Sequence, residues 1–272
     1  MKARVKLYFG ILFFFSTVTI QAQTKSQWAI WKEREAIGES DTSFYKKDFK
    51  DKYCHYNFSN IWTQTENLSV LGFIGNNYQR LRIKFLSVLK DSAYPDIYFV
   101  IGKSMVKDSV RSFKGEIIIT NIRIYKDFQY GDAQKYTKAQ IAKKGVIFGN
   151  YYFSEDSTQT KTGIFKGSFA SCWFIDNQGR LKYDDDAGVS DSYCNNQFTG
   201  IWQSYKSQIK ETCNWGDYRI PFSGKFDWGA GDFSADTAYL KYGWKDYYDL
   251  TIKTGNDTEY KKAEKDAEKW WK

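Results

Sequence analysis

Histidine and proline are scarce in this 272-residue chain, which has one histidine, His55, and only two prolines. A serine or cysteine nucleophile with a histidine partner would have to use His55, and the adjacent Cys54 would face away from it in a strand. A zinc site needs four ligands at tighter spacing than one histidine and scattered cysteines provide. The sequence also contains no G-x-S-x-G, H-E-x-x-H, Walker or G-x-G-x-x-G motif. We therefore expect no cofactor, and none of the enzyme classes that these motifs define.

Long apolar runs are missing everywhere except at the beginning of the chain. Residues 1–22 are predicted to be a signal peptide, with a basic start, an uncharged apolar run from Leu7 to Ile20, and Ala22 before the cleavage site. This run is shorter than the roughly 18 residues that a spanning helix needs. We expect the protein to be exported to the periplasm or beyond the cell, with no integral membrane segment in the mature chain.

Strong charge clustering is also absent. The chain has 40 Lys and Arg against 32 Asp and Glu, a net charge of +8, and the two signs are interspersed. Nucleic-acid-binding proteins usually gather their basic residues into runs or patches. Nucleic acid is therefore not an expected partner, and the charge supports at most a weak attraction to anionic surfaces of the envelope.

Cysteine is present at four positions, which are Cys54, Cys172, Cys194 and Cys213. An exported chain enters an oxidising compartment, where one or two disulfides can form. The pair we expect is Cys194 with Cys213, because the residues between them are enough for a strand and its return. Buried or unpaired thiols are the alternative.

Aromatic residues are abundant, at 19% of the chain. They suit the pleated, half-buried surfaces of strands and bury large areas. A Phe-x-Gly pattern recurs with copies that begin at Phe73, Phe113, Phe165, Phe198 and Phe222. A glycine two residues from a ring lies on the same strand face and leaves room for a second ring or a bend. Such positions are typical of strongly curved sheets and barrels.

Local patterns predict strands around 81–85, 97–101 and 116–125, and a hairpin turn at 177–179. The predicted fold class is all-β, as a mainly antiparallel curved sandwich or lipocalin-like barrel with a short C-terminal helix. Residues 23–255 are expected to form one β-rich domain. The alternative is two packed β subdomains with a break near 131–146.

Two segments have helical patterns. Residues 132–144 begin with a capping aspartate and end before Gly145, and an ordered loop is the alternative for this stretch. Residues 256–272 place Tyr260, Ala263, Ala267 and two tryptophans on one face, which predicts an amphipathic helix. We expect that helix to dock on the sheet through its rings, with a tail that binds a partner or a membrane surface as the alternative.

The loops at 213–221 and 226–233 combine tryptophan, glycine and aspartate. Tryptophan offers a stacking face, glycine permits sharp turns, and aspartate accepts hydrogen bonds. The candidate ligand-binding residues are therefore Trp215, Asp217, Arg219, Trp228 and Asp232. A structural corner, with packed tryptophans and aspartates that cap the backbone, is the competing interpretation.

An acidic stretch supplies Asp184, Asp186 and Asp191 as the only candidate metal ligands. Calcium takes several oxygens from turn-rich loops, but the order of a known calcium loop is absent here. We therefore expect a solvated loop and no metal site.

Several segments show a resemblance to known proteins. They are Asn76–Ile83, Gly102–Ser104, Asn195–Trp202 and Cys213–Pro221. They resemble an uncharacterised family of exported Gram-negative bacterial proteins, which has no assigned activity and so implies none here. Residues Phe198–Trp202 are also similar to the Gly-x-Trp strand of lipocalin-like barrels.

The sequence favours a non-enzymatic envelope or secreted binding protein, with a glycan or another envelope component as partner. The alternative is a secreted glycan-directed hydrolase that uses paired carboxylates chosen from Asp217, Asp227 and Asp232. Such an enzyme needs two carboxylates roughly 5–10 Å apart across a cleft. The sequence does not indicate an oligomeric state.

Overall fold

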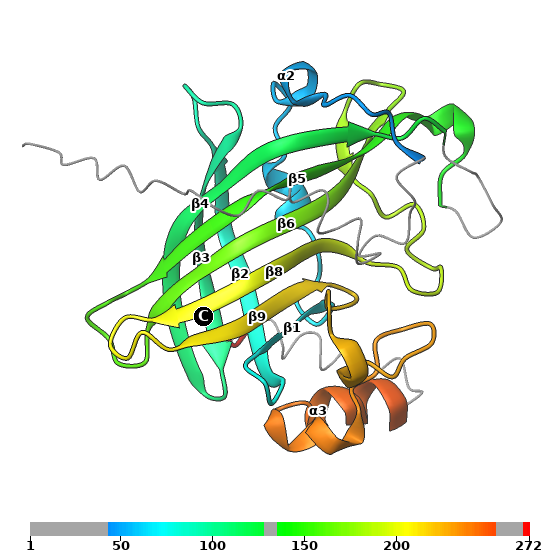
Figure 1. Cartoon of the computed structure of the whole chain (residues 1–272). Coiled ribbons are helices and arrows are strands. Elements are labelled where there is room, and N and C mark those ends of the chain that lie inside the picture. The colour runs from blue at the N-terminus through cyan, green and yellow to red at the C-terminus, as the bar shows by residue number, and fades with distance from the viewer. Residues whose placement is uncertain (1–42, 128–134, 254–268) are drawn as a thin grey trace, which may run out of the picture.

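The computed structural model describes residues 43–127, 135–253 and 269–272. Its strands are β1 (Val70–Ile74), β2 (Gln79–Lys90), β3 (Ile97–Val106), β4 (Ser109–Ile124), β5 (Ile141–Glu155), β6 (Gly163–Asp176), β7 (Leu181–Tyr183), β8 (Asn195–Ser204) and β9 (Lys210–Asp217). All neighbouring pairs are antiparallel. The order runs β1 to β6, then β8 and β9, and the β9–β1 pairing closes the ring (Figure 1). The all-β prediction is confirmed, and the architecture is the lipocalin-like barrel.

The hairpin predicted at 177–179 is confirmed. It joins β6 to the short strand β7, and Gly179 has a φ of 77°. Glycine adopts this left-handed conformation without the steric cost that a side chain brings. β7 pairs with β6 beyond the point where β8 stops pairing with it, so the two strands share one edge of β6.

Rings fill the inside of the barrel. Buried aromatic side chains project inward from five of the strands, β4, β5, β6, β8 and β9: Phe113, Phe153, Phe165, Phe169, Trp173, Phe198 and Trp215. Trp215 stacks on Phe198 with ring centroids 4.8 Å apart and an interplanar angle of 9°. The abundant aromatics of the sequence therefore form a packed core in the middle of the barrel.

Two copies of the Phe-x-Gly pattern, those that begin at Phe165 and Phe198, are explained by the close approach of β6 and β8. Gly167 lies directly opposite Gly200. A Cβ at Gly200 would clash with the Lys166 carbonyl oxygen and lie 2.7 Å from Tyr151 Oη. The paired glycines therefore let the two strands and the ring of Tyr151 share a space that two side chains would fill.

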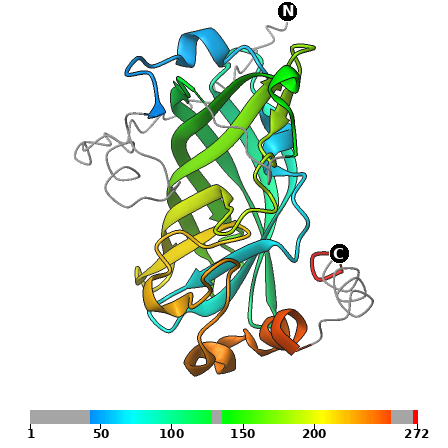
Figure 2. The same cartoon turned by 90° about the vertical axis from the view of Figure 1, so that its right-hand side faces the viewer.

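The segment before β1 packs into one end of the barrel. It contains α2 (Lys50–Tyr53) and the 3-10 turn η2 (Ser59–Trp62), and Figure 2 shows α2 at the upper end. Phe58 and Trp62 are buried in the same cluster as the inward rings of the strands. Trp62 Nε1 donates to Ser171 Oγ over 3.0 Å, which anchors the segment to β6.

The chain after β9 packs on the outside of β1. It forms the 3-10 turns η4 (Gly224–Phe226) and η5 (Thr237–Tyr242), the short helix α3 (Lys245–Tyr248) and the π-helical turn η6 (Asp249–Lys253). A second cluster of buried side chains, which includes Phe226, Phe233 and Trp244, covers Leu71 and Phe73. No helix of the described residues has the length and apolar character to cross a membrane.

The helix predicted over 256–272 falls largely on residues 254–268, which lie outside the described residues. Residues 269–272 end the chain in a turn. The ring of Trp271 lies 5.1 Å from Lys84 Nζ, a cation–π contact that places the chain end beside β2.

The helix predicted over 132–144 is wrong at its described end. The 3-10 turn η3 (Lys138–Gln140) closes on a capping box between Thr137 and Gln140, and β5 begins at Ile141. From there β5 pairs with β6, and from Gly145 it pairs with β4 as well, so the hydrogen bonds of the barrel override the local helical pattern.

The expected Cys194–Cys213 disulfide is wrong. All four cysteines lie in described ranges, and no disulfide joins any two of them. The strand and its return do form, but Cys213 lies opposite Gly200, while Cys194 precedes the other end of β8. Cys194 is therefore six positions along the chain from the residue opposite Cys213, which exceeds the reach of a disulfide.

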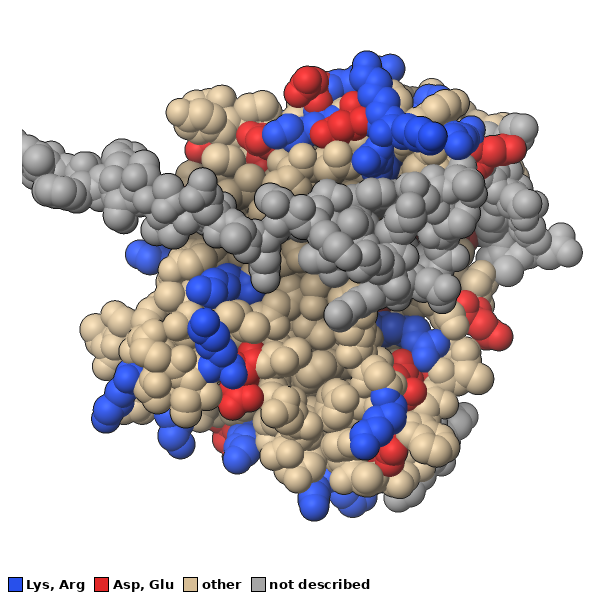
Figure 3. Space-filling view, viewed as in Figure 1, with Lys and Arg blue, Asp and Glu red and all other residues tan. Residues whose placement is uncertain are grey.

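Charged side chains of both signs are spread over the surface. Figure 3 shows lysines and arginines lying among aspartates and glutamates at both ends of the face that it presents. The net charge of the sequence is therefore not gathered into one patch on that face.

Candidate functional site

A cleft opens through the barrel wall between β1 and β2. These strands pair at only two positions, Phe73 with Arg80 and Ile74 with Gln79, while β1 stays paired with β9 along its whole length. The cleft lies where β1 and β2 have separated, with Val70 on one side and residues 83–85 on the other. The segment 62–67 and the ends of β8 and β9 complete its lining.

Asp217, at the end of β9, is the carboxylate of this cleft and is only 3% exposed. Its Oδ2 accepts hydrogen bonds from Thr65 Oγ1 at 2.7 Å, Tyr183 Oη at 2.9 Å and Asn196 Nδ2 at 2.7 Å. Burial raises the pKa of Asp217 to about 7, against the opposing effects of these donors and the charge of Lys84. The carboxyl therefore exists in both protonation states near neutral pH.

Asn196 presents a buried acceptor that has no partner. Its Nδ2 donates to the Ile61 carbonyl oxygen and to Asp217 Oδ2, both at 2.7 Å. Because both of these partners are acceptors, the orientation of the amide is fixed and Oδ1 lies on its other side. Asn196 Oδ1 is buried and has no hydrogen-bond partner within the described part of the chain.

Asn67 Oδ1 is a second buried acceptor without a described partner, and Asn67 lines the same cleft. Buried polar atoms in proteins are nearly always hydrogen-bonded, so two exceptions in one cleft need an explanation. A ligand that donates hydrogen bonds would satisfy both.

A bulge at the start of β8 positions Asn196. The register of β8 and β9 shifts between Asn195 and Phe198, and Asn196 has a φ of 45°, which asparagine tolerates better than most residues. The Asn195 side chain binds both the backbone N–H and the carbonyl of Cys172, and so replaces strand pairing to β6. Gln197 Nε2 donates to the Arg219 carbonyl at 2.9 Å. Three consecutive amide side chains thus hold the bulge.

Aromatic rings form the apolar part of the cleft. Trp62, Phe85, Phe198 and Trp215 all line it, although Trp215 is 2% exposed and belongs mainly to the core. The space open to water within the cleft is ≈ 30 Å³. The cleft in this structure therefore has room for a few waters or one small functional group of a ligand.

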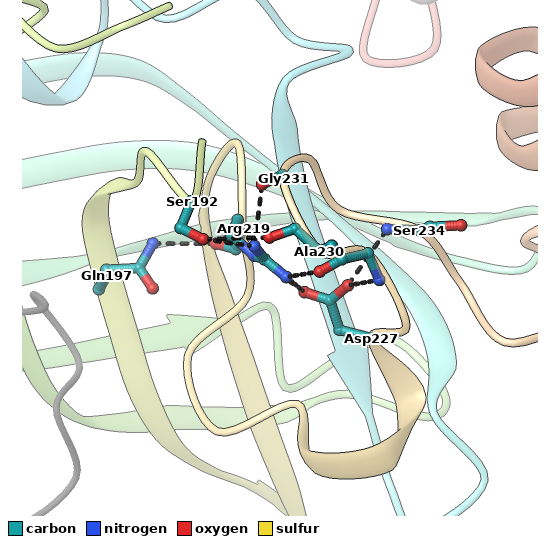
Figure 4. Close-up of polar contacts among 8 residues, drawn as sticks. Ser192, Gln197, Arg219, Asp227, Ala230, Gly231 and Ser234 are labelled. Atoms are coloured by element: carbon teal, nitrogen blue, oxygen red, sulfur yellow. Dashed lines mark hydrogen bonds and ion pairs between the residues drawn. The ribbon is translucent and has the colours of Figure 1, made fainter. Parts of the chain in front are cut away.

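Arg219 fastens the loop that follows β9 (Figure 4). Its Nε and Nη2 donate to Asp227 Oδ2 at 3.0 and 2.7 Å, and its other donors reach the carbonyls of Gly229 and Gly231. Asp227 Oδ1 accepts from the backbone of Gly229 and Ser234. This network occupies Arg219, so its role in the structure is to hold residues 227–234 in one conformation.

The five predicted ligand-binding residues fall into separate groups. Trp215 and Asp217 line the cleft, and Arg219 lies in the loop network. Trp228, which is 73% exposed, and the exposed Asp232 lie on the loop that Arg219 holds. The cleft residues Thr65, Asn67 and Asn196 are not predicted by the sequence patterns, and neither is Tyr183, which donates to Asp217. The signal that was available for Asn196 is a run of amide residues, which strands disfavour, at 195–197.

The solvated loop expected at the candidate metal ligands is wrong for Asp184 and Asp186, which are buried around a lysine. Lys144 Nζ lies 3.1 Å from Asp184 Oδ2 and 3.1 Å from Asp186 Oδ2. Although burial lowers the pKa of Lys144, the two carboxylates outweigh it and the pKa is raised. Asp191 is exposed. No group of three or more histidine, cysteine or acidic residues suited to a metal occurs within the described ranges.

Asp217 is the single carboxylate among the residues that line the cleft. Asp227 is held by Arg219, and Asp232 lies on the outer loop. The arrangement can accept hydrogen bonds from a ligand and exchange one proton. Among the described residues, the lining holds no second acid of the kind that a two-carboxylate glycosidase requires.

Comparisons of the chain with protein-family models, with curated proteins and with solved structures find no match.

Proposed function

We propose that this protein is an exported, non-enzymatic binding protein that takes a hydroxyl-bearing group of a glycan or related envelope component into the cleft beside Asp217. The observation that carries the proposal is the unpartnered, buried Oδ1 of Asn196 in the lining of the cleft. An acceptor left unsatisfied in the interior costs about 1–3 kcal/mol. A ligand hydroxyl that donates to it removes that cost.

The other cleft residues suit the same ligand chemistry. Asn67 adds a second acceptor, and Asp217 can accept a hydrogen bond when ionised or donate one when protonated. A sugar hydroxyl both donates and accepts, so it fits either state of the carboxyl. Trp62 at the cleft supplies an apolar face for the carbon skeleton.

Binding is favoured over hydrolysis because a glycosidase needs two carboxylates at the cleft, and Asp217 is the one carboxylate of the described lining. The predicted export of the chain also places it where envelope glycans occur. Trp228, on the loop that Arg219 holds, lies outside the cleft lining and has no role in this proposal.

The test is a titration with N-acetylglucosamine oligomers, maltose oligomers and soluble peptidoglycan fragments, followed by tryptophan fluorescence. Trp62 and Trp215 at the cleft would report occupancy. Asn67→Leu keeps a similar volume and removes one acceptor, so affinity for the bound oligomer is expected to fall about tenfold, the effect of one lost hydrogen bond.

The matched control is Asn77→Leu in the exposed turn between β1 and β2, which should leave affinity unchanged. Equal loss in both variants, or undiminished affinity in Asn67→Leu, would remove the cleft as the binding site.

A further inference from the structure

The outer face of β2 to β5 exposes large apolar side chains. Its members are Leu86 (45% exposed), Leu89 (63%), Phe99 (46%), Ile101 (54%) and Tyr152 (48%). We call this set the apolar face. Single exposed apolar side chains are common in folded proteins, whereas a contiguous group of them marks an interaction surface.

The strand register makes the apolar face continuous. Leu89 lies opposite Phe99, Phe99 opposite Glu116, and Glu116 opposite Tyr152, so one row crosses four strands. Ile101 is two residues from Phe99 on the same side of β3. Directly opposed side chains lie about 4.5–5.5 Å apart at Cβ, so Leu89, Phe99 and Ile101 form one apolar patch. Leu86 lies in the bulge of β2 beside it, and Glu116 separates Phe99 from Tyr152.

Lysines border the apolar face. Lys103 follows Ile101 on the same side of β3, Lys114 is opposite Ile101, and Lys166 is opposite Tyr152. Neither Lys103 nor Lys114 forms an ion pair with another described residue. Glu116 is the one acidic residue within these rows, so the border is positively charged overall.

We infer that the apolar face is a docking surface for an anionic phospholipid bilayer. Exposed rings and aliphatic side chains enter the boundary between headgroups and acyl chains, while lysines at the border meet lipid phosphates. The positive border disfavours a second copy of the same face, because its lysines would meet lysines. The inference does not depend on the proposed ligand of the cleft.

The position of the face gives it a structural link to the cleft. Residues 83–85 of β2 line the cleft, and Leu86 follows directly on the same strand. A protein docked through this face would hold the cleft close to the headgroup layer.

The test is co-sedimentation with vesicles of phosphatidylcholine alone and of phosphatidylcholine mixed equally with phosphatidylglycerol. The protein is used as it is recovered from the cells that express it, with its N-terminus determined by mass so that all variants match. We expect binding to the mixed vesicles, weakened by salt, and at least about tenfold less binding to the neutral vesicles.

The double variants Phe99→Ser with Ile101→Ser, and Lys103→Glu with Lys114→Glu, should each reduce binding to the mixed vesicles at least about tenfold. The matched controls are Val189→Ser with Ile209→Ser, which are 84% and 56% exposed, and Lys206→Glu with Lys225→Glu. Circular dichroism verifies that each variant is folded.

Absence of binding by the unmodified protein would overturn the inference, as would unchanged binding in either face variant or equal loss in the controls. A doubled mass in solution that Phe99→Ser with Ile101→Ser abolishes would show that a second copy covers the face, and would overturn it as well.

Discussion

A carboxyl group as deeply buried as that of Asp217 makes folding sensitive to pH. Its pKa in the folded protein is about 7, whereas the ordinary value is 3.8. Between these values the unfolded chain releases the proton while the folded protein keeps it. Stability attributable to this group therefore falls as pH rises from about 4 to about 7, and is constant above that.

The variant Asp217→Asn should remove this dependence. Asparagine keeps an oxygen for the donors on Thr65, Tyr183 and Asn196 and cannot ionise. Relative to the unmodified protein, its free energy of unfolding should improve between pH 4 and pH 8 by up to roughly 4 kcal/mol, the equivalent of the raised pKa. Urea denaturation at the two pH values measures the difference.

A stability difference between variant and parent that is the same at both pH values would mean that Asp217 titrates near its ordinary pKa. The cleft would then be wetter than the burial of this side chain indicates.

Two tryptophans in similar sequence surroundings should differ strongly in how much stability is lost when each is replaced by alanine. Trp215 is 2% exposed and stacks on Phe198, so Trp215→Ala should lower the free energy of unfolding by about 3–5 kcal/mol. Trp228 is 73% exposed, so Trp228→Ala should change it by less than about 0.5 kcal/mol. Chemical denaturation compares them, and similar losses for both would contradict the burial described here.

At the scale of elements, the contact between β6 and β8 depends on glycine. Gly200→Ala would force its Cβ against the Lys166 carbonyl and Tyr151 Oη, so we expect a loss of more than about 3 kcal/mol of stability. Gly179→Ala is the control, because no atom lies within 4 Å of its Cβ position and only its φ of 77° opposes a side chain. That control should cost about 1 kcal/mol.

Thermal unfolding of the two variants distinguishes the steric effect from the backbone effect. If Gly200→Ala costs no more than Gly179→Ala, the two strands can separate enough to admit a methyl group.

Local patterns predicted the elements whose sequences alternate or turn sharply. The strands around 81–85, 97–101 and 116–125 and the turn at 177–179 are present because their side-chain period and turn glycine are properties of a few adjacent residues. The beginning of β5 was misassigned because Lys144 becomes buried against Asp184 and Asp186, which no local window contains.

At the scale of the whole molecule, the cleft exists because distant segments meet when the barrel closes. Thr65 binds Asp217 across 152 residues, and Asn196 binds the Ile61 carbonyl across 135. The composition of residues 213–221 identified Asp217 as a candidate. It gave no indication of Thr65, Asn67 or Asn196, because a sequence does not show which segments the β1–β9 pairing brings together.

The same closure separates the segments 213–221 and 226–233, which look equivalent in the sequence because each combines one tryptophan with glycine and aspartate. One runs from the end of β9, where Asp217 faces the cleft, and the other is held on the outside by Arg219. A ligand could bind in the cleft or on the outer loop. A measurement that resolves individual side chains distinguishes these two binding sites.

The most direct test is an NMR titration with the oligomer that binds most tightly in the fluorescence measurements. It follows the side-chain amide signals of Asn67 and Asn196 together with the indole signal of Trp228. We expect the two amide signals to shift to saturation with one dissociation constant while the Trp228 signal stays unchanged. A shift of Trp228 with both amides unmoved would place the ligand on the outer loop and contradict the assignment of the cleft.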